Sequence, residues 1–180
     1  EHVLTCVLTS IKNILPYYKA QLDKNWRPTS YKTIAETTVT ILGLGEIGKD
    51  VAIKFVNLGF TVKGWSNSSK NIEGVESFSG LNELENAISQ TDFIINILPL
   101  TAQTEGILNE QFFKFCSDNT VLINVGRGGH LVENDLLTAI KNNKIKEAYL
   151  DVFIEEPLPE NHSLWTNSQV YVTPHIASMT

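Results

Sequence analysis

Two kinds of apolar pattern alternate along the chain from residue 38 onward. Short runs of β-branched and aliphatic residues predict strands, and apolar positions three and four residues apart predict helices. The strands are expected at 38–42, 61–66, 75–78, 92–98, 120–125, 148–153 and 170–173. The helices are expected at 46–58, 80–90, 105–115 and 134–142, with a short turn at 162–166. This alternation predicts an α/β fold with a doubly wound parallel sheet.

Residues 1–37 precede the alternating pattern. Residues 1–22 have apolar positions at helical spacing, and Pro16 is expected to kink or restart that helix. Residues 23–37 are polar and predict a connecting loop. The broad apolar stripe of the helix fits either core packing or a subunit interface, and both interpretations stay open. The chain is therefore divided into an N-terminal helix and loop, 1–37, and a single domain, 38–180.

Three glycines follow the first predicted strand with the spacing G-x-G-x-x-G. Gly43 allows a sharp turn, Gly45 lets a pyrophosphate approach the backbone, and Gly48 lets the helix pack close to the strand. The free N–H groups at the start of this helix, near Glu46 and Ile47, would hold the phosphates. The pattern predicts a Rossmann dinucleotide-binding domain over residues 38–180.

In such a sheet, ligands bind beyond the carboxyl ends of the strands. Arg127, Glu156 and His175 follow three different strands, so their side chains are expected at one edge. Each alone also fits a solvated loop residue, a surface acid or a turn histidine, and their joint placement favours a catalytic set. The candidates for cofactor binding at these ends are Gly43, Gly45, Glu46, Ile47, Gly48, Trp65, Ser66, Asn67, Ser68, Lys70, Leu98, Pro99, Thr104, Val125, Gly126, Arg127, Asp151 and His175.

Composition narrows the classes of partner. The net charge of −6 argues against a nucleic-acid or anionic-membrane surface, and no apolar run has the length of a membrane span. Cys6 and Cys116 are expected as buried free thiols in a reducing cytosol, and the four histidines show no metal-ligand spacing. The chain starts at Glu1 inside a helical pattern and stops without a terminating signal, so we expect it to be part of a longer protein.

These residues resemble the nucleotide-binding domain of the D-isomer-specific 2-hydroxyacid dehydrogenases, and within them the glyoxylate/hydroxypyruvate reductase branch. One departure is Gly126, where the family more often has alanine, and we expect it to be tolerated. The segments that carry the resemblance are Gly-Leu-Gly-Glu-Ile-Gly (43–48), Gly-Trp-Ser-Asn-Ser-Ser-Lys (64–70), Leu-Pro-Leu-Thr-Ala-Gln-Thr (98–104), Asn-Val-Gly-Arg-Gly-Gly (124–129), Leu-Asp-Val-Phe-Ile-Glu-Glu-Pro-Leu-Pro (150–159), Leu-Trp (164–165) and Thr-Pro-His-Ile-Ala (173–177).

The resemblance implies an oxidoreductase that transfers hydride between NAD(P)H and a small 2-oxo acid or 2-hydroxy acid. Arg127 corresponds to the arginine that binds substrate, His175 to the catalytic histidine and Glu156 to its acidic partner. Such a histidine would give a proton to the substrate oxygen, and the adjacent carboxylate would favour its charged form. Arg127 offers a planar fork for the substrate carboxylate.

The resemblance also implies a substrate domain that is absent from this chain, since the family inserts its nucleotide domain into that second domain. We therefore expect the chain to bind dinucleotide without full activity. The helix at 1–22 resembles a crossover segment that often helps to form a homodimer, which raises the weight of an interface role.

The end of the second predicted strand bears on the choice of cofactor. NAD-specific sites place an acid about 20 residues after the glycines. Here Lys63–Trp65 lie at that distance and Ser66 ends the strand. The absence of an acid, with Ser68, Ser69 and Lys70 nearby, favours NADP over NAD. The arginines that usually clamp the 2′-phosphate in this branch are replaced by Asn67 and Ser69, which weakens that preference.

Two other classes stay open. A dinucleotide-sensing module on the same fold would bind cofactor without catalysis and would not need Arg127, Glu156 and His175 together. A methyltransferase also uses a glycine-rich first turn, but it would not explain this set. The sequence does not identify the 2-oxo acid.

Overall fold

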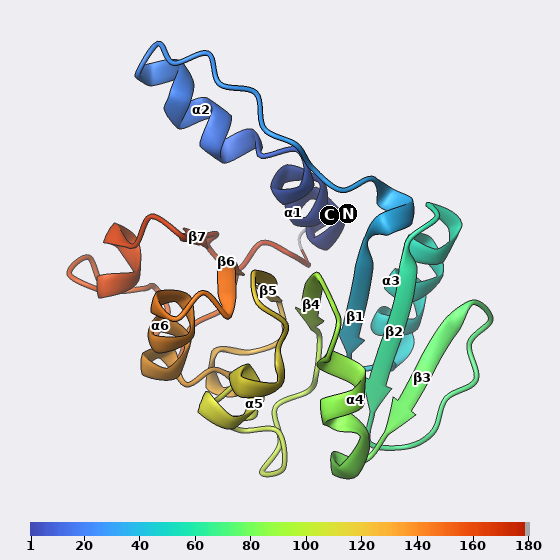
Figure 1. Ribbon diagram of the computed structural model, residues 1–180. Coiled ribbons are helices and arrows are strands. Elements are labelled where there is room, and N and C mark those ends of the chain that lie inside the picture. The colour runs from blue at the N-terminus through green and yellow to red at the C-terminus, as the bar shows by residue number, and fades with distance from the viewer. Residues whose placement is uncertain (179–180) are drawn as a thin grey trace.

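A seven-stranded parallel sheet forms the centre of the computed structural model, which describes residues 1–178. The strand order is β3-β2-β1-β4-β5-β6-β7, so the order reverses between β1 and β4 (Figure 1). This is the doubly wound sheet that the sequence predicts. The strands are β1 (Thr38–Leu42), β2 (Thr61–Ser66), β3 (Val75–Ser79), β4 (Phe93–Asn96), β5 (Thr120–Asn124), β6 (Ile145–Leu150) and β7 (Val170–Val172).

Helices cover both faces of the sheet (Figure 1). Neighbouring residues in the central strands point to opposite faces, so Ile41 and Ile95 pack under α1 and α3, whereas Leu42 and Ile94 pack under α4, α5 and α6. The helices are α1 (His2–Ile11), α2 (Ile14–Leu22), α3 (Glu46–Asn57), α4 (Leu84–Ile88), α5 (Glu110–Phe115) and α6 (Glu133–Lys141), with short 3-10 turns η1 (Ile34–Glu36), η2 (Leu81–Glu83), η3 (Gly128–His130) and η4 (Ser163–Thr166).

The N-terminal helix is interrupted before the proline rather than at it. Asn13 adopts a left-handed conformation with φ 50° between α1 and α2. Pro16 is then the third residue of α2, where a missing N–H is tolerated because the first turn has no carbonyl partner for it. No residue of α2 is buried, and α2 projects away from the sheet (Figure 1).

Several element boundaries differ from the predicted ones, and the fourth strand ends at Asn96 instead of residue 98 while the sixth begins at Ile145 instead of residue 148. The sixth strand ends at Leu150 instead of residue 153, so Asp151 lies just beyond the sheet edge and not within a strand. The helix predicted at 105–115 begins only at Glu110, as α5. It begins there because the Asn109 side chain accepts a hydrogen bond from the Phe112 N–H and caps the helix. The predicted helix at 80–90 consists of η2 followed by α4.

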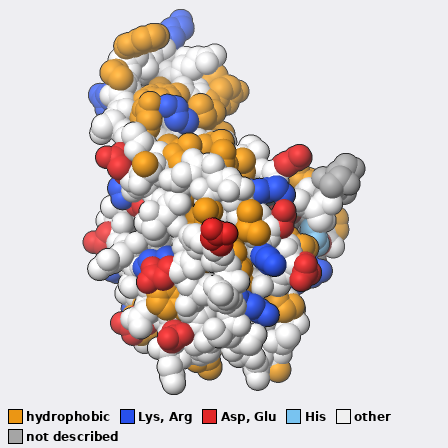
Figure 2. Space-filling model, turned by 90° about the vertical axis from the view of Figure 1, so that its right-hand side faces the viewer, with side chains coloured by type: hydrophobic (Ala, Val, Ile, Leu, Met, Phe, Trp, Pro, Cys, Tyr) orange, Lys and Arg blue, Asp and Glu red, His pale blue; other side chains and the backbone are white. Residues whose placement is uncertain are grey.

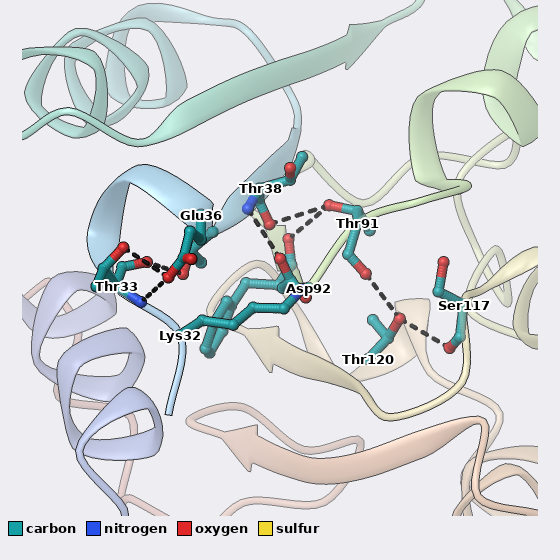
Figure 3. A network of polar contacts seen from close by, with 10 residues as sticks. Lys32, Thr33, Glu36, Thr38, Thr91, Asp92, Ser117 and Thr120 are labelled. Atoms are coloured by element: carbon teal, nitrogen blue, oxygen red, sulfur yellow. Dashed lines mark hydrogen bonds and ion pairs between the residues drawn. The ribbon is translucent and has the colours of Figure 1, made fainter. Parts of the chain in front are cut away.

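A chain of polar contacts joins the strands at their amino ends (Figure 3). The Asp92 carboxylate accepts hydrogen bonds from the Thr38 N–H at 3.0 Å and from Lys32 Nζ at 2.6 Å. The Thr120 hydroxyl donates to the Thr91 carbonyl at 2.9 Å. These contacts fix the ends of β1, β4 and β5 opposite the carboxyl edge, where the candidate functional residues lie.

Within residues 1–178, none of the helices combines the length and the apolar character needed to cross a bilayer. The described residues also contain no group of three or more His, Cys, Asp or Glu side chains arranged to hold a metal ion.

Candidate active site

The glycine-rich turn joins β1 to α3. Gly43 has φ +104°, and its N–H donates to the Trp65 carbonyl at the end of β2. A Cβ on Gly48 would lie 1.7 Å from the Gly43 carbonyl oxygen, so only glycine lets α3 pack this closely. A Cβ on Gly45 would meet nothing within 4 Å, so open space lies beside the backbone at the start of α3.

This open backbone fits the diphosphate of a dinucleotide. Glu46 and Ile47 form the first turn of α3, both side chains are exposed, and their N–H groups have no carbonyl partner within the helix. An anion placed beside Gly45 could therefore accept hydrogen bonds from these N–H groups and benefit from the helix dipole.

The end of β2 supplies a short polar turn. The Ser66 hydroxyl donates to the Ser68 carbonyl at 2.8 Å, and Asn67, Ser68 and Lys70 are exposed. The Trp65 ring is buried, with its indole N–H donating to the carbonyl just after β3. Any contact of Trp65 with a ligand would therefore use its backbone rather than its ring.

The ends of β4 and β5 contribute backbone more than side chains. Leu98 and Gly126 are buried, Val125 is half-buried and Pro99 is exposed. The Thr104 hydroxyl donates to the Pro99 carbonyl at 2.7 Å and so shapes this loop. These five predicted residues thus lie along the carboxyl edge of the two central strands.

Three fully buried polar side chains that were not predicted from the sequence support these strand ends. Asn96 is the last residue of β4, Asn124 the last of β5, and His130 the last of η3. Asn96 Nδ2 donates to Asn124 Oδ1 at 2.9 Å and lies 3.0 Å from His130 Nδ1. The available signal was an asparagine at the same place in two otherwise apolar strands.

Arg127 lies in the loop between β5 and η3. Its side chain is exposed, and Nη1 donates to the Gly126 carbonyl at 2.7 Å. A Cβ on the next residue, Gly128, would lie 2.0 Å from the Phe153 carbonyl carbon. The Arg127 loop therefore packs directly on the backbone that follows β6.

Glu156 and His175 are in contact. Glu156 Oε2 lies 2.7 Å from His175 Nδ1, and Glu156 Oε1 accepts a hydrogen bond from the Phe153 N–H at 2.8 Å. The hydrogen bond from His175, and then that from Phe153, lower the pKa of the Glu156 carboxyl below its ordinary value. The carboxylate is therefore ionised at neutral pH and orients the ring, which leaves His175 Nε2 for a substrate.

Asp151 fixes the segment that carries His175. Its buried carboxylate accepts hydrogen bonds from the Thr173 hydroxyl at 2.6 Å and from the N–H groups of Ile176 and Ala177 at 2.9 and 2.8 Å. His175 itself has φ 54°, a left-handed conformation that these contacts hold. Asp151, predicted to bind cofactor, is placed here as a support for the histidine.

The strands β5, β6 and β7 are consecutive neighbours, so Arg127, Glu156 and His175 follow adjacent strand ends. The structure brings Glu156 and His175 into contact and places Arg127 on the loop beside them. The arrangement provides a proton donor, a carboxylate that orients it and a cation at the edge where the glycine turn also lies.

Known proteins are similar to this chain in sequence and in fold. The model for the NAD binding domain of D-isomer specific 2-hydroxyacid dehydrogenases matches residues 4–177. Glyoxylate/hydroxypyruvate reductase A of Yersinia enterocolitica is 43% identical over 180 residues, which are 100% of this chain and 58% of that protein.

Solved structures of D-isomer specific 2-hydroxyacid dehydrogenases are also similar to this chain in fold. A D-isomer specific 2-hydroxyacid dehydrogenase of Xanthobacter autotrophicus, in complex with NADPH and MES, aligns with a TM-score of 0.94 at 38% identity over 99% of this chain and 74% of that chain. The NADPH-dependent glyoxylate/hydroxypyruvate reductase of Sinorhizobium meliloti, in apo form, aligns with a TM-score of 0.93 at 38% identity over 99% and 71%.

The chain spans 58% of the length of the curated relative from Yersinia enterocolitica. The matched part includes the glycine turn and all three residues of the candidate catalytic set. The chain therefore belongs to the D-isomer specific 2-hydroxyacid dehydrogenase family, and the part of that family that it matches is the NAD binding domain.

Proposed function

We propose that this chain is the cofactor-binding part of an oxidoreductase that reduces a small 2-oxo acid of the glyoxylate or hydroxypyruvate type. The observation that carries the proposal is the 2.7 Å contact between Glu156 and His175 at the sheet edge that also bears the glycine turn. A dinucleotide sensor would have no use for an oriented histidine beside an arginine, so this contact favours catalysis over sensing.

The roles of the three side chains follow from their chemistry. When bound, the nicotinamide supplies or accepts the hydride. His175 Nε2 would donate a proton to the substrate carbonyl oxygen, and the Glu156 carboxylate would hold the ring in the orientation that allows this. Arg127 would turn from the Gly126 carbonyl to the substrate carboxylate, which is the stronger acceptor.

The preferred cofactor in this proposal is NADP, with NAD as the alternative. The exposed turn after β2 contains Asn67, Ser68, Ser69 and Lys70 and no acid that would repel a 2′-phosphate. The relative from Xanthobacter autotrophicus was solved with NADPH, and that from Sinorhizobium meliloti is NADPH-dependent. Titration of the chain with each reduced cofactor tests the preference, because tighter binding of NADH would contradict it.

The substrate domain would lie outside these 180 residues, since the relatives are longer than this chain. Without that domain, water reaches the site and the 2-oxo acid is poorly oriented. The purified chain should therefore bind NADPH and turn over little substrate. Turnover by the chain alone at the rate of an ordinary dehydrogenase would contradict the need for a second domain.

The experiment that tests the activity is a screen of the full-length enzyme with glyoxylate, hydroxypyruvate, pyruvate and phosphohydroxypyruvate, each with NADH and NADPH. We expect cofactor oxidation with at least one acid and a loss of that oxidation in His175→Gln. Tight NADPH binding without oxidation by any of the four acids would instead support the sensing module.

We also propose a homodimer formed through the arm, defined as residues 13–32. The arm exposes five large apolar or aromatic side chains, and Figure 2 shows hydrophobic side chains gathered where it projects at the top of the molecule. The partner that we propose for this apolar surface is the arm of a second copy of the chain, because that arm exposes the same five side chains. The five side chains are Ile14, Tyr18, Leu22, Trp26 and Tyr31.

A cytoplasmic location completes the proposal. Cys6 and Cys116 are free and buried, and burial raises the pKa of both thiols to about 12. Unpaired cysteines of this kind suit a reducing compartment. The net charge of −6 gives no reason to expect a nucleic-acid or anionic-membrane partner.

A further inference from the structure

The buried side chains of Asn96, Asn124 and His130 form a cluster that contacts the backbone of the Arg127 loop. All three side chains have 0% exposure, and β4 and β5, which end in the two asparagines, lie side by side (Figure 1). Burying polar groups lowers stability unless each finds a partner. The partners of this cluster should therefore show what it is for.

The cluster binds the backbone of the Arg127 loop at several points. The Arg127 N–H donates to His130 Nδ1 at 3.1 Å, and Asn124 Nδ2 donates to the Arg127 carbonyl at 3.3 Å. The Gly126 N–H donates to Asn124 Oδ1 at 3.2 Å. The peptide groups on both sides of Arg127 are thus held by the cluster, while its exposed guanidinium donates to the Gly126 carbonyl.

These contacts determine which ring nitrogen of His130 carries the proton. A backbone N–H can only donate, so Nδ1 must be an unprotonated acceptor. The proton is then on Nε2, which is buried and has no hydrogen-bond partner among residues 1–178, although the Pro99 backbone lies near the ring. Burial lowers the pKa of His130, which keeps the ring neutral.

We propose that neutral His130 is a positioning residue for Arg127, whose backbone it fixes so that the guanidinium meets the substrate carboxylate. The inference deepens the proposed function and rests on it. His130 touches neither substrate nor cofactor in this scheme and acts only through the Arg127 N–H.

Gly126 fits this arrangement. A Cβ at position 126 would lie 3.0 Å from both His130 Nδ1 and Asn96 Nδ2, which is tighter than ordinary contact. The glycine therefore leaves the room in which the imidazole ring and the asparagine amide meet. This gives a local reason for the glycine at position 126.

Two substitutions of matched shape separate the hydrogen bond from the volume of the ring. His130→Asn places an amide oxygen where Nδ1 lies, two bonds beyond Cβ, and so keeps the acceptor. His130→Leu places a methyl group there and leaves the Arg127 N–H without a partner. In the full-length enzyme we expect His130→Leu to lower kcat/KM for the 2-oxo acid about tenfold or more, chiefly through KM.

The asparagine variant should retain at least about a third of the wild-type kcat/KM, since the lost acceptor is restored. The dissociation constant for NADPH should change less than about threefold in both variants, because the glycine turn is untouched. Equal losses in the two variants, or a wild-type kcat/KM in His130→Leu, would show that the acceptor at Nδ1 does not matter.

A measurement without turnover keeps the inference testable if the leucine variant does not fold or the wild type does not reduce any of the acids. Nitrogen-15 chemical shifts of the His130 ring in the wild-type protein should show Nδ1 unprotonated and Nε2 protonated. The Arg127 amide proton should exchange slowly in wild type and in His130→Asn. A proton on Nδ1, or fast exchange of that amide in wild type, would overturn the inference whatever the reaction is.

Discussion

Side chains in the candidate site are oriented by backbone N–H groups of the loops around them. Glu156 is an example, because one of its oxygens is fixed by the Phe153 N–H and only the other faces His175. A carboxylate held at two points has little rotational freedom left, so the ring it contacts is oriented as well. The site therefore depends on residues that never touch a substrate.

Glu156 should make the stability of the folded chain depend on pH. Its pKa is lowered in the folded chain, so its contribution to stability is present above the ordinary carboxyl pKa and is lost as the pH falls through the lowered value. We expect Glu156→Gln to lower the urea midpoint of unfolding near neutral pH, and the difference from wild type to shrink as the pH falls below the ordinary carboxyl pKa of about 4.3. The control is Glu155→Gln, which changes the exposed neighbouring carboxyl. It should leave the urea midpoint close to that of wild type at every pH.

The same substitution has a consequence for catalysis in the full-length enzyme. The neutral amide no longer stabilises a positive charge on His175, so the pH optimum of reduction should move to lower values. An unchanged profile of rate against pH in Glu156→Gln would contradict the role assigned to this carboxylate.

Arg127 allows a test of geometry as well as charge. Arg127→Ala should lower kcat/KM for the 2-oxo acid about 10- to 100-fold, because a hydrogen bond to a charged group is worth about 1.5–3 kcal/mol. Arg127→Lys retains the charge but not the planar fork, and it should recover only part of the loss. Full recovery with lysine would show that charge alone suffices.

At the scale of elements, η3 contacts the backbone that follows β6, and this contact joins Arg127 to the Glu156–His175 pair. Gly128 lies against the backbone of Phe153, and Phe153 in turn orients Glu156. A displacement of η3 would therefore move Arg127 and the Glu156–His175 pair together. The two loops are therefore in direct backbone contact, although they are far apart in the sequence.

Gly128→Ala tests this coupling. Its Cβ would lie 2.0 Å from the Phe153 carbonyl carbon and 2.4 Å from the Ile154 nitrogen, so backbone must shift, and we expect about 1–3 kcal/mol of lost stability together with loss of turnover. Gly129→Ala is the matched control, since its Cβ would meet only the flexible Leu100 side chain at 3.0 Å. Similar urea midpoints for the two variants would contradict the coupling.

The elements that the sequence predicts well are those whose apolar pattern is decided locally. The buried runs of β1 and β5, and the glycine spacing before α3, need no tertiary information. The break before α2 depends on the left-handed Asn13, and the end of β6 at Leu150 depends on pairing with β5 and β7, so neither boundary follows from the pattern.

The residues of the candidate site also differ in how far the sequence predicts them. Arg127, Glu156 and His175 follow strand ends, and a reader of the sequence can place them at one edge. Asp151 is placed at a strand end as well, but its contacts with the His175 segment, like those of His130 with Arg127, join groups that only the fold brings close. Trp65 shows the converse, because the sequence places it at a strand end but does not reveal that the core buries its ring.

At the scale of the whole molecule, most of the arm projects beyond the domain (Figure 1), although Lys32 at its end contacts Asp92 and Lys19 Nζ donates to the Ser168 carbonyl. A cavity of about 550 Å³ lies between the arm and the amino edge of the sheet, close to the Lys32–Asp92 contact of Figure 3. The arm therefore stands off the body, with apolar side chains outward. This arrangement is the reason for expecting a second copy there.

The dimer prediction is tested by light scattering of the purified chain. Wild type should have about twice the monomer mass of 20.1 kDa. The double substitution Leu22→Glu and Trp26→Glu should give monomers with unchanged NADPH affinity, because charges on the arm prevent association. Leu81→Glu alters an exposed apolar residue away from the arm and should leave the mass unchanged. Monomeric wild type, or a dimer that survives the double substitution, would contradict this interface.

The three tryptophans also make the protein its own optical probe. Trp26 on the arm is 96% exposed, Trp165 beside the Glu156 loop is 51% exposed, and Trp65 in the core is 3% exposed. Emission at long wavelength, and its quenching by acrylamide, should therefore come mainly from Trp26. A blue shift with rising protein concentration, absent in Trp26→Phe, would report association of the arms without any added label.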